Sequence, residues 1–255
     1  MIHVENISKS FDGTPVLRGM STVFDKGKTN LIIGQSGSGK TVFLKCLLGL
    51  FETDSGRIKF ENKALDEMTN KDRSILRQEI GMVFQGSALF DSMTVEENIM
   101  FPMQMFTKKE DEEIRERANQ VIKRVNLINA NEKFPDEISG GMKKRVAIAR
   151  SIVMNPKYLF CDEPNSGLDP NTAILIDNLI QEITDEYKIT TVINTHDMNS
   201  VMQIGDKIVF LKDGVKAWEG TNKEIFKTDN EAVVKFVYSS ELFKKVRLTY
   251  LNETK

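Results

Sequence analysis

The sequence contains few cysteines, no long apolar run and no excess of basic residues. Two cysteines in 255 residues cannot form a disulfide framework, which excludes a small secreted fold held together by disulfides. The most apolar stretch covers ten residues from Val42 to Phe51 and contains Lys45, whereas a membrane-spanning helix needs roughly 20 apolar residues. The first residues, Met1 to Glu5, lack the basic start and the apolar stretch of a signal peptide. We therefore expect a reduced, cytosolic chain that does not cross a bilayer.

Charge and composition narrow the class of protein further. The 35 lysine and arginine residues are balanced by 37 aspartate and glutamate residues, which gives a formal net charge of −2. Such a chain has no overall positive field to attract a polyphosphate backbone, so nucleic acid is not an expected partner. With 40% hydrophobic and 28% charged residues, the chain has the balance of a globular protein with a sizeable core. Fibrous and wholly disordered classes are excluded.

The order of apolar segments predicts an α/β fold. Four short runs lack strict alternation, which is typical of strands covered on both faces: Leu31–Ile33, Met82–Phe84, Tyr158–Cys161 and Thr191–Ile193. Helical patterns separate these runs at Val42–Leu50, Ile114–Val125, Gly140–Met154 and Thr172–Glu186. Strand and helix therefore alternate, which favours a central, mostly parallel sheet. No repeat and no linker rich in proline, glycine or serine divides the chain, so one main domain is expected.

Two further segments depart from this alternation. Lys207–Trp218 predicts an antiparallel β-hairpin, because Asp213 and Gly214 suit the positive φ angles of a tight primed turn. Between Asn70 and Pro135 the pattern is helical, which indicates a helical insertion into the α/β core. The charged run Lys108–Glu113 in this segment is interpreted as a solvated helix face without a functional role.

Residues 34–41 have the pattern of a phosphate-binding loop. They follow the predicted strand Leu31–Ile33 and open the helix that starts at Val42, which is the setting such a loop requires. Glycines let backbone N–H groups turn toward phosphates, and the helix N-terminus adds a partial positive charge. Lys40 is expected to reach the β- and γ-phosphate oxygens, and the Thr41 hydroxyl is expected to face Mg²⁺. The predicted nucleotide-binding residues here are Gly34, Gln35, Ser36, Gly37, Ser38, Gly39, Lys40 and Thr41.

Two adjacent carboxylates end the predicted strand Tyr158–Cys161. In a doubly wound sheet they stand at the carboxyl edge, beside the phosphate-binding loop. Asp162 fits the carboxylate that holds Mg²⁺ in nucleotide hydrolases with such a loop, and Glu163 is placed to orient and deprotonate the attacking water. The alternative is that both are ordinary solvated acids at a strand end.

A second anion-binding pattern begins at Ser139. Ser139 is a natural N-cap for a helix running to about Met154, and Gly140 and Gly141 allow backbone N–H groups to approach an anion. With the loop and the carboxylates, this segment resembles the ATP-binding cassette (ABC) ATPases, whose signature is usually written Leu-Ser-Gly-Gly-Gln. Ile138 and Met142 replace the first and last residues of that signature here. The resemblance implies that Ser139, Gly140 and Gly141 bind nucleotide.

The remaining elements of the family occur in order between Ile2 and Phe226. The resemblance implies that Phe11 stacks on adenine and that Gln85 joins Mg²⁺ to the helical subdomain. It implies that His196 contacts the γ-phosphate, although a lone histidine after a strand would otherwise be an ordinary core or surface residue. The loop that crosses to a partner subunit is implied at Ser166, Gly167, Leu168 and Asp169.

The resemblance also assigns cofactors and roles. It implies ATP and Mg²⁺, with metal ligands Thr41, Gln85 and Asp162. The implied catalytic residues are Glu163 and His196. The implied fold is that of a P-loop NTPase with a central, mostly parallel sheet, an antiparallel β subdomain and an inserted α-helical subdomain.

Two strings indicate a subtype. Phe84–Met93 and Ile138–Arg150 are similar to the ATPase of Mla-type lipid transporters, which work with a permease and a lipid-binding protein bearing an Mce domain. The resemblance implies phospholipid as the cargo and a peripheral position on the cytoplasmic face of the inner (plasma) membrane. The implied partners are a second copy of the chain, an integral-membrane permease and an Mce-domain protein.

Domain limits and assembly follow from the same comparison. We expect an ABC ATPase domain over residues 1–228, with the helical subdomain inserted at about 86–155, and a C-terminal extension over 229–255. Two chains are expected to pair head to tail, with ATP held between the phosphate loop of one and Ser139–Gly141 of the other. The extension is expected to pack on its own core or on the second subunit, because it carries many apolar residues: Val233, Val234, Phe236, Val237, Leu242, Phe243, Val246 and Leu248.

Other functions remain open at this point. The same ATPase could serve an amino-acid or other small-solute importer. A non-transport ATPase in DNA maintenance or translation is disfavoured by the single cassette and the net charge. A cassette that binds ATP without hydrolysis is disfavoured by Lys40, Asp162, Glu163 and His196. The apolar residues after Gln85, including Leu89 and Phe90, are expected either to form a groove for a short permease helix or only to pack the subdomain.

Overall fold

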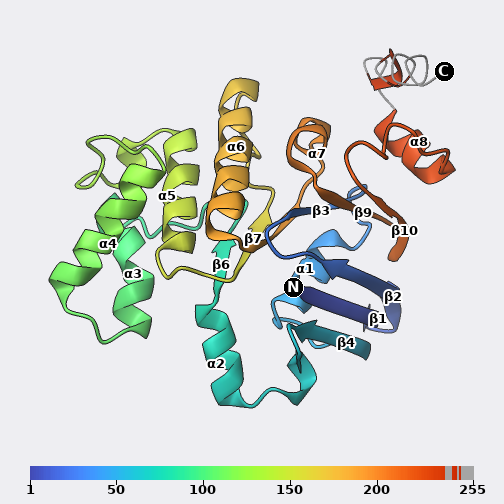
Figure 1. Ribbon diagram of the computed structural model, residues 1–255, viewed down its shortest axis with the longest axis horizontal. Helices are drawn as coiled ribbons and strands as arrows, with labels where there is room; N and C mark the ends of the chain where they lie inside the picture. Colours follow the sequence, from blue (N-terminus) through green and yellow to red (C-terminus); the bar gives the residue numbers. More distant parts are fainter. Residues whose placement is uncertain (239–242, 246, 248–255) are drawn as a thin grey trace. The chain divides into compact units, whose positions relative to one another are not determined.

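The computed structural model describes residues 1–238, 243–245 and 247 (Figure 1). The chain forms two compact units, one made of Met1–Met68 with Asn194–Lys255 and the other of Thr69–Ile193. Among the described residues, none of the helices has the length and apolar character needed to cross a membrane.

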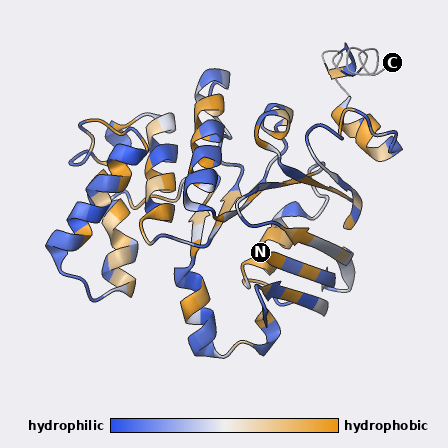
Figure 2. Cartoon of the chain, in the orientation of Figure 1, coloured by the Kyte–Doolittle hydropathy of each residue, from blue (hydrophilic) through white to orange (hydrophobic). Residues whose placement is uncertain are grey.

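The first unit opens with an antiparallel sheet of strand order β2-β1-β4-β5. Its strands are β1 (Ile2–Phe11), β2 (Thr14–Phe24), β4 (Ser55–Phe60) and β5 (Lys63–Ala64), followed by the 3₁₀ turn η1 (Leu65–Glu67). Ile2, Val4 and Ile7 of β1 are buried, and Figure 2 shows the strands banded in apolar and polar colours. Successive side chains of a strand point to opposite faces, so one face of this sheet supplies core.

A second group of strands in the first unit supports the phosphate-binding loop. The strands β3 and β9 are parallel neighbours, and β10 pairs antiparallel with β9. The elements are β3 (Thr29–Ile33), α1 (Lys40–Leu47), α7 (Met198–Ile204), β9 (Lys207–Lys212) and β10 (Val215–Gly220). The hairpin predicted at Lys207–Trp218 is confirmed, because Asp213 and Gly214 connect β9 to β10 with φ angles of 50° and 77°.

The described part of the C-terminal extension packs on the first unit. Helix α8 (Glu231–Val237) buries Val233 completely, and Phe236 stacks on Phe210 of β9 with ring centroids 5.1 Å apart. The Tyr238 hydroxyl donates a buried hydrogen bond of 2.9 Å to the Ile225 carbonyl oxygen. These contacts agree with packing on its own core. Leu242, Val246 and Leu248 of the predicted apolar set lie outside the described residues.

The second unit contains the strands β8, β7 and β6 as consecutive neighbours, with β6 and β7 parallel. Its elements around these strands are α2 (Asn70–Gln78), β6 (Ile80–Val83), β7 (Tyr158–Asp162), α6 (Pro170–Tyr187) and β8 (Thr190–Asn194). Every residue of β8 is buried, as expected for a strand covered on both faces. With the parallel pair β3–β9, these strands confirm the predicted α/β class.

Three packed helices form the rest of the second unit (Figure 1). They are α3 (Val95–Phe106), α4 (Asp111–Arg124) and α5 (Gly140–Ile152), and the 3₁₀ turn η2 (Pro135–Glu137) precedes α5. Helix α4 buries Ile114, Ala118 and Val121 along one stripe, and Figure 2 shows most of its remaining surface as hydrophilic. The run Lys108–Glu113 is exposed, as expected for a solvated face, but only Asp111–Glu113 belong to α4.

Candidate functional site

The predicted site residues are divided between the two units. The first unit holds a set that we call the phosphate half: Phe11, Gly34–Thr41 and His196. The second unit holds a set that we call the signature half: Gln85, Ser139–Gly141, Asp162, Glu163 and Ser166–Asp169. Each half is built from its own elements.

Backbone geometry explains the glycines of the phosphate-binding loop. Gly39 is the N-cap of α1 with φ 101°, and no side chain caps the first turn of that helix. A Cβ atom on Gly34 would lie 2.3 Å from the Leu211 carbonyl oxygen, so the loop passes too close to β9 for any larger residue. The N–H groups of the first turn of α1 are therefore presented without a competing side chain, as an anion site requires.

Polar groups in this loop suit a phosphate. Lys40 is 9% exposed, and its Nζ donates hydrogen bonds of 2.9 Å to the Gly34 carbonyl oxygen and 3.1 Å to that of Gln35. The Ser38 hydroxyl is buried and has no hydrogen-bond partner among the described residues. Thr41 follows Lys40 in α1 and is exposed. A cation, a buried hydroxyl and a helix N-terminus without a side-chain cap form a donor set that fits phosphate oxygens, with the Thr41 hydroxyl available to Mg²⁺.

The other residues of the phosphate half are accessible. The Phe11 ring is 38% exposed and meets Phe51 edge-on with centroids 5.3 Å apart, which leaves ring surface for stacking. His196 is exposed and lies between β8 and α7. The backbone on both sides of it is fixed, because the Thr195 N–H donates to the Ile32 carbonyl oxygen and the Asp197 side chain caps α7.

The signature half begins at the N-terminus of α5. Ser139 caps this helix by accepting a hydrogen bond from the Met142 N–H at 3.3 Å, which confirms the predicted cap. A Cβ atom on Gly141 would lie 2.7 Å from Thr172 Cγ2, and one on Gly140 would lie 3.6 Å from Leu168 Cδ2. The signature glycines therefore pack directly against the predicted dimer loop and the start of α6.

The two carboxylates stand at the carboxyl end of β7, the strand end that the sequence predicts. Asp162 is the last residue of β7, and Glu163 follows with a φ of 48°, a conformation that costs energy for a residue with a side chain. A turn places the Ser166 N–H 3.2 Å from the Glu163 carbonyl oxygen, and Asn165 donates to the buried Asp177 carboxylate at 3.3 Å. These contacts hold Glu163 in its unusual backbone conformation at the end of the strand.

Gln85 joins the same group of loops. Its side-chain amide donates a hydrogen bond of 3.4 Å to the Ser166 hydroxyl, so the structure brings the predicted metal ligand next to the predicted dimer loop. Two residues that the sequence analysis did not select also contact this loop. Lys144 donates to the Gln85 carbonyl oxygen, and Arg150 donates to the carbonyl oxygens of Ser87 and Ala88. In the sequence they are two of the four basic residues of α5, and no pattern singles them out.

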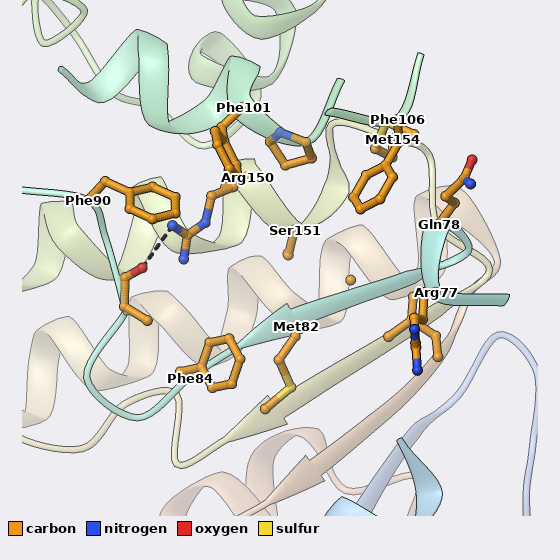
Figure 3. A pocket seen from close by; sticks show the side chains of 14 residues that line it. Arg77, Gln78, Met82, Phe84, Phe90, Phe101, Phe106, Arg150, Ser151 and Met154 are labelled. Carbon is orange, nitrogen blue, oxygen red and sulfur yellow. Dashed lines mark hydrogen bonds between the residues drawn. The ribbon is translucent and has the colours of Figure 1, made fainter. Parts of the chain in front are cut away.

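An apolar groove lies beyond the Gln85 loop. Its volume is about 300 Å³, and its lining includes Met82, Phe84, Phe90, Phe101, Phe106 and Met154. Phe84, Phe90 and Phe106 are 44%, 41% and 51% exposed, which is unusual for side chains of this size. Figure 3 shows Phe90, Phe101 and Phe106 around the groove, with Arg150 beside Phe90. A groove is therefore present within the second unit and is lined by Phe90 as predicted, whereas Leu89 does not line it.

Sequence comparison identifies relatives of the chain. Residues 17–166 match the family described as ABC transporter. The methionine import ATP-binding protein MetN of Clostridium tetani (strain Massachusetts / E88) is 38% identical over 242 residues, which are 95% of this chain and 76% of MetN. The arginine transport ATP-binding protein ArtM of Bacillus subtilis (strain 168) is 37% identical over 226 residues, which are 89% of this chain and 93% of ArtM.

A solved structure has the same fold. The dimeric post-hydrolysis state of the ATP-binding cassette MJ0796, bound to ADP and Pi, matches with a TM-score of 0.79 and 29% identity. The match covers 87% of this chain and 99% of that one. The predicted fold, an α/β cassette with antiparallel and helical parts, is confirmed.

Proposed function

The chain belongs to the ABC transporter family as an ATP-hydrolysing subunit that uses Mg²⁺, and we propose that it drives the import of an amino acid or a similarly small solute. ATPases of this family form dimers and associate with membrane permeases. The structural observation that carries the ATPase assignment is the loop Gly34–Thr41, which joins a buried strand to the uncapped N-terminus of α1.

In the proposed mechanism, the phosphate half binds ATP, and the signature half supplies the general base and binds the nucleotide held by a second chain. Lys40 leaves its loop carbonyl partners and binds phosphate oxygens, and His196 contacts the terminal phosphate. Thr41, Gln85 and Asp162 would hold the metal ion. Mg²⁺, when bound, neutralises charge on the phosphate oxygens. Phe11 stacks on the adenine ring.

Glu163 acts as the general base for hydrolysis. Its carboxylate orients a water molecule and accepts its proton as the water oxygen bonds to the terminal phosphorus, while the bond to the leaving ADP oxygen breaks. The backbone contacts that hold Glu163 at the end of β7 fix the point from which its side chain extends, which lowers the entropy cost of the step. Ser139, Gly140 and Gly141 bind the nucleotide held by a second chain, and Ser166–Asp169 form the crossing contact of that head-to-tail dimer.

The groove next to Phe90 is the proposed permease contact. An apolar groove lined by exposed aromatic rings suits the apolar side of a short helix. We also propose an ATPase domain over residues 1–228 with a helical subdomain at about 86–155, and a C-terminal extension over 229–255. The subunit then acts peripherally at the cytoplasmic face of the membrane that holds the permease.

The choice of solute rests on the relatives. MetN and ArtM carry names of amino-acid transport, and their matches extend over 95% and 89% of this chain. These names favour the small-solute alternative over phospholipid transport. Phospholipid transport with an Mce-domain partner remains a second candidate on the two strings Phe84–Met93 and Ile138–Arg150.

One experiment separates the two candidates. The chain is purified with its native membrane partners, the partners are identified by mass spectrometry, and ATP hydrolysis is measured in proteoliposomes. An importer predicts stimulation by methionine or arginine together with a solute-binding protein. Co-purification of a lipid-binding protein and phospholipid, without stimulation by amino acids, would replace the first candidate by the second.

A further inference from the structure

The loop after β6 has an unusual backbone that its own residues do not explain. Ser87 and Ala88 have φ angles of 64° and 48°, in the left-handed region that residues with side chains seldom adopt. Ser87 is buried and Ala88 is exposed. Neither is a glycine, so both carry a Cβ atom in this conformation, and Gly86 before them does not relieve the strain. Two consecutive residues in this conformation cost free energy that contacts elsewhere must offset.

Two side chains of α5 supply such contacts. The Lys144 ammonium donates to the Gln85 carbonyl oxygen, and the Arg150 guanidinium donates to the Ser87 and Ala88 carbonyl oxygens at 2.8 Å and 2.9 Å. Hydrogen bonds from charged donors are stronger than those between neutral groups. The helix that carries the signature glycines at its N-terminus therefore holds three carbonyl oxygens of the Gln85 loop.

Both cations are partly or fully shielded from water, so they depend on the loop carbonyl oxygens as hydrogen-bond partners. Lys144 is 5% exposed, and burial lowers its pKa. Burial also lowers the pKa of Arg150, whose guanidinium lies 5.9 Å from the Phe90 ring centroid. A buried cation needs a polar partner, and the loop carbonyls provide it. The loop therefore needs the two cations of α5 to hold its backbone, and the two cations need the loop carbonyl oxygens as partners.

We propose that Lys144 and Arg150 are positioning residues that clamp the Gln85 loop to the signature helix, so that α5 sets where the Gln85 side chain stands during hydrolysis. The clamp also joins the loop to the groove, because Arg150 lines the groove beside Phe90. The effect of the clamp on hydrolysis rests on the proposed role of Gln85 as a metal ligand. The existence of the clamp does not depend on that role.

The test uses the full-length chain and a matched pair of variants. Lys144→Met keeps the length and apolar stem of the side chain but removes the donor, and Lys143→Met makes the same change at the preceding, partly exposed position. We expect hydrogen exchange in the segment 84–90 to become at least about tenfold faster in Lys144→Met and to stay unchanged in Lys143→Met, while α6 exchanges as in the wild type. Thermal unfolding temperatures check that both variants are folded.

Kinetics of the chain in complex with its permease provide the second readout. Misplacement of a catalytic group by about 1 Å costs up to about 10²-fold in rate, so kcat of Lys144→Met should fall by about 10- to 100-fold. KM for ATP should change less than about twofold, since the hydrogen bonds of the clamp join residues of the second unit only to one another. Lys144→Gln, which retains a donor, should recover part of kcat, and Arg150→Lys should lose less than Arg150→Met.

The outcomes separate the two parts of the inference. Unchanged exchange at 84–90 in a folded Lys144→Met chain overturns the clamp. Faster exchange with unchanged kcat overturns its role in hydrolysis. Gln85→Ala is measured alongside, and a normal kcat in that variant contradicts the proposed role of Gln85 itself, while the exchange result still decides whether the clamp exists.

Discussion

The Lys40 ammonium lies 2.9 Å from the carbonyl oxygen of Gly34, the residue that opens its own phosphate-binding loop. The loop is thus closed on itself by the residue that is expected to bind the phosphate. Because the same nitrogen also donates to Gln35, binding of an anion exchanges two neutral acceptors for charged ones. Lys40 therefore has two roles. It stabilises the loop when no ligand is bound, and it is expected to bind the phosphate when ATP is present.

Lys40→Met therefore removes both the hydrogen bonds that stabilise the loop and the contact with the phosphate. Loss of a hydrogen bond to a charged group costs about 1.5–3 kcal/mol, so ATP affinity should fall about 10- to 100-fold. Equilibrium binding of a fluorescent ATP analogue measures the change. The control is Lys45→Met, an exposed lysine of the same helix whose ammonium lies over the Phe51 ring. Equal affinities in wild type and Lys40→Met would reject the assignment of the loop.

Glu163→Gln tests the base. The amide keeps the shape of the side chain but cannot accept the proton, so ATP binding should persist while the hydrolysis rate drops about 10²-fold or more. The variant should also accumulate a closed, ATP-bound dimer, which sedimentation in the presence of Mg²⁺-ATP detects. Near-normal turnover of the complete transporter carrying Glu163→Gln would assign the base elsewhere.

Several elements were predictable because their signals are local. The end of α5 was predicted at Met154 and lies at Ile152, and its N-cap at Ser139 is confirmed, since a capping serine before two glycines depends on neighbouring residues only. The predicted start of α1 at Val42 was late, because Lys40 and Thr41 already belong to the helix. A loop motif and a helix overlap there, and the apolar pattern reveals only the later residues.

The contacts of the Gln85 loop were not predictable in the same way. Its hydrogen bonds join residues separated by about sixty positions, such as Arg150 and Ser87, and a single sequence contains no local pattern for them. The N-terminal strands β1, β2 and β4 were likewise not located, because β1 contains register shifts that interrupt the period of two. The packing of the C-terminal extension could not be decided from the sequence. An apolar helix face predicts burial, but it does not tell whether the helix packs on its own core or on a second subunit.

Phe90→Ala tests the groove. Removing an aromatic anchor at an interface typically costs at least about 1–2 kcal/mol, so retention of the permease during purification should fall about tenfold or more. Nucleotide affinity of the isolated subunit should not change, because Phe90 lies in the groove and outside both halves of the site. Phe134→Ala removes a comparably exposed ring that does not line the groove and serves as the control. Unchanged permease retention in Phe90→Ala would place the coupling surface elsewhere.

The two cysteines should be unreactive in the folded chain. Cys46 and Cys161 are buried, and burial raises the pKa of the Cys46 thiol to about 11 and that of Cys161 further. Because the thiolate is the reactive form, a disulfide reagent at pH 8 should modify neither residue rapidly. Both thiols should react once the chain is unfolded in denaturant. Rapid modification of Cys46 in the native chain would contradict its position in α1.

Tyr238→Phe measures how firmly the extension packs on the first unit. The substitution removes a buried hydrogen bond and leaves the Ile225 carbonyl oxygen without its donor, so the free energy of unfolding should fall by about 1–2 kcal/mol. Burial raises the pKa of the Tyr238 hydroxyl from 10.0 to about 12, so the contribution is fully present below pH 10 and is lost as pH rises through 12. Urea unfolding at pH 7 measures the difference, with Tyr187→Phe at a partly exposed position as the control. If Tyr238→Phe matches the wild type, the hydroxyl contributes nothing measurable, and the hold of the extension must come from the apolar contacts of Val233 and Phe236.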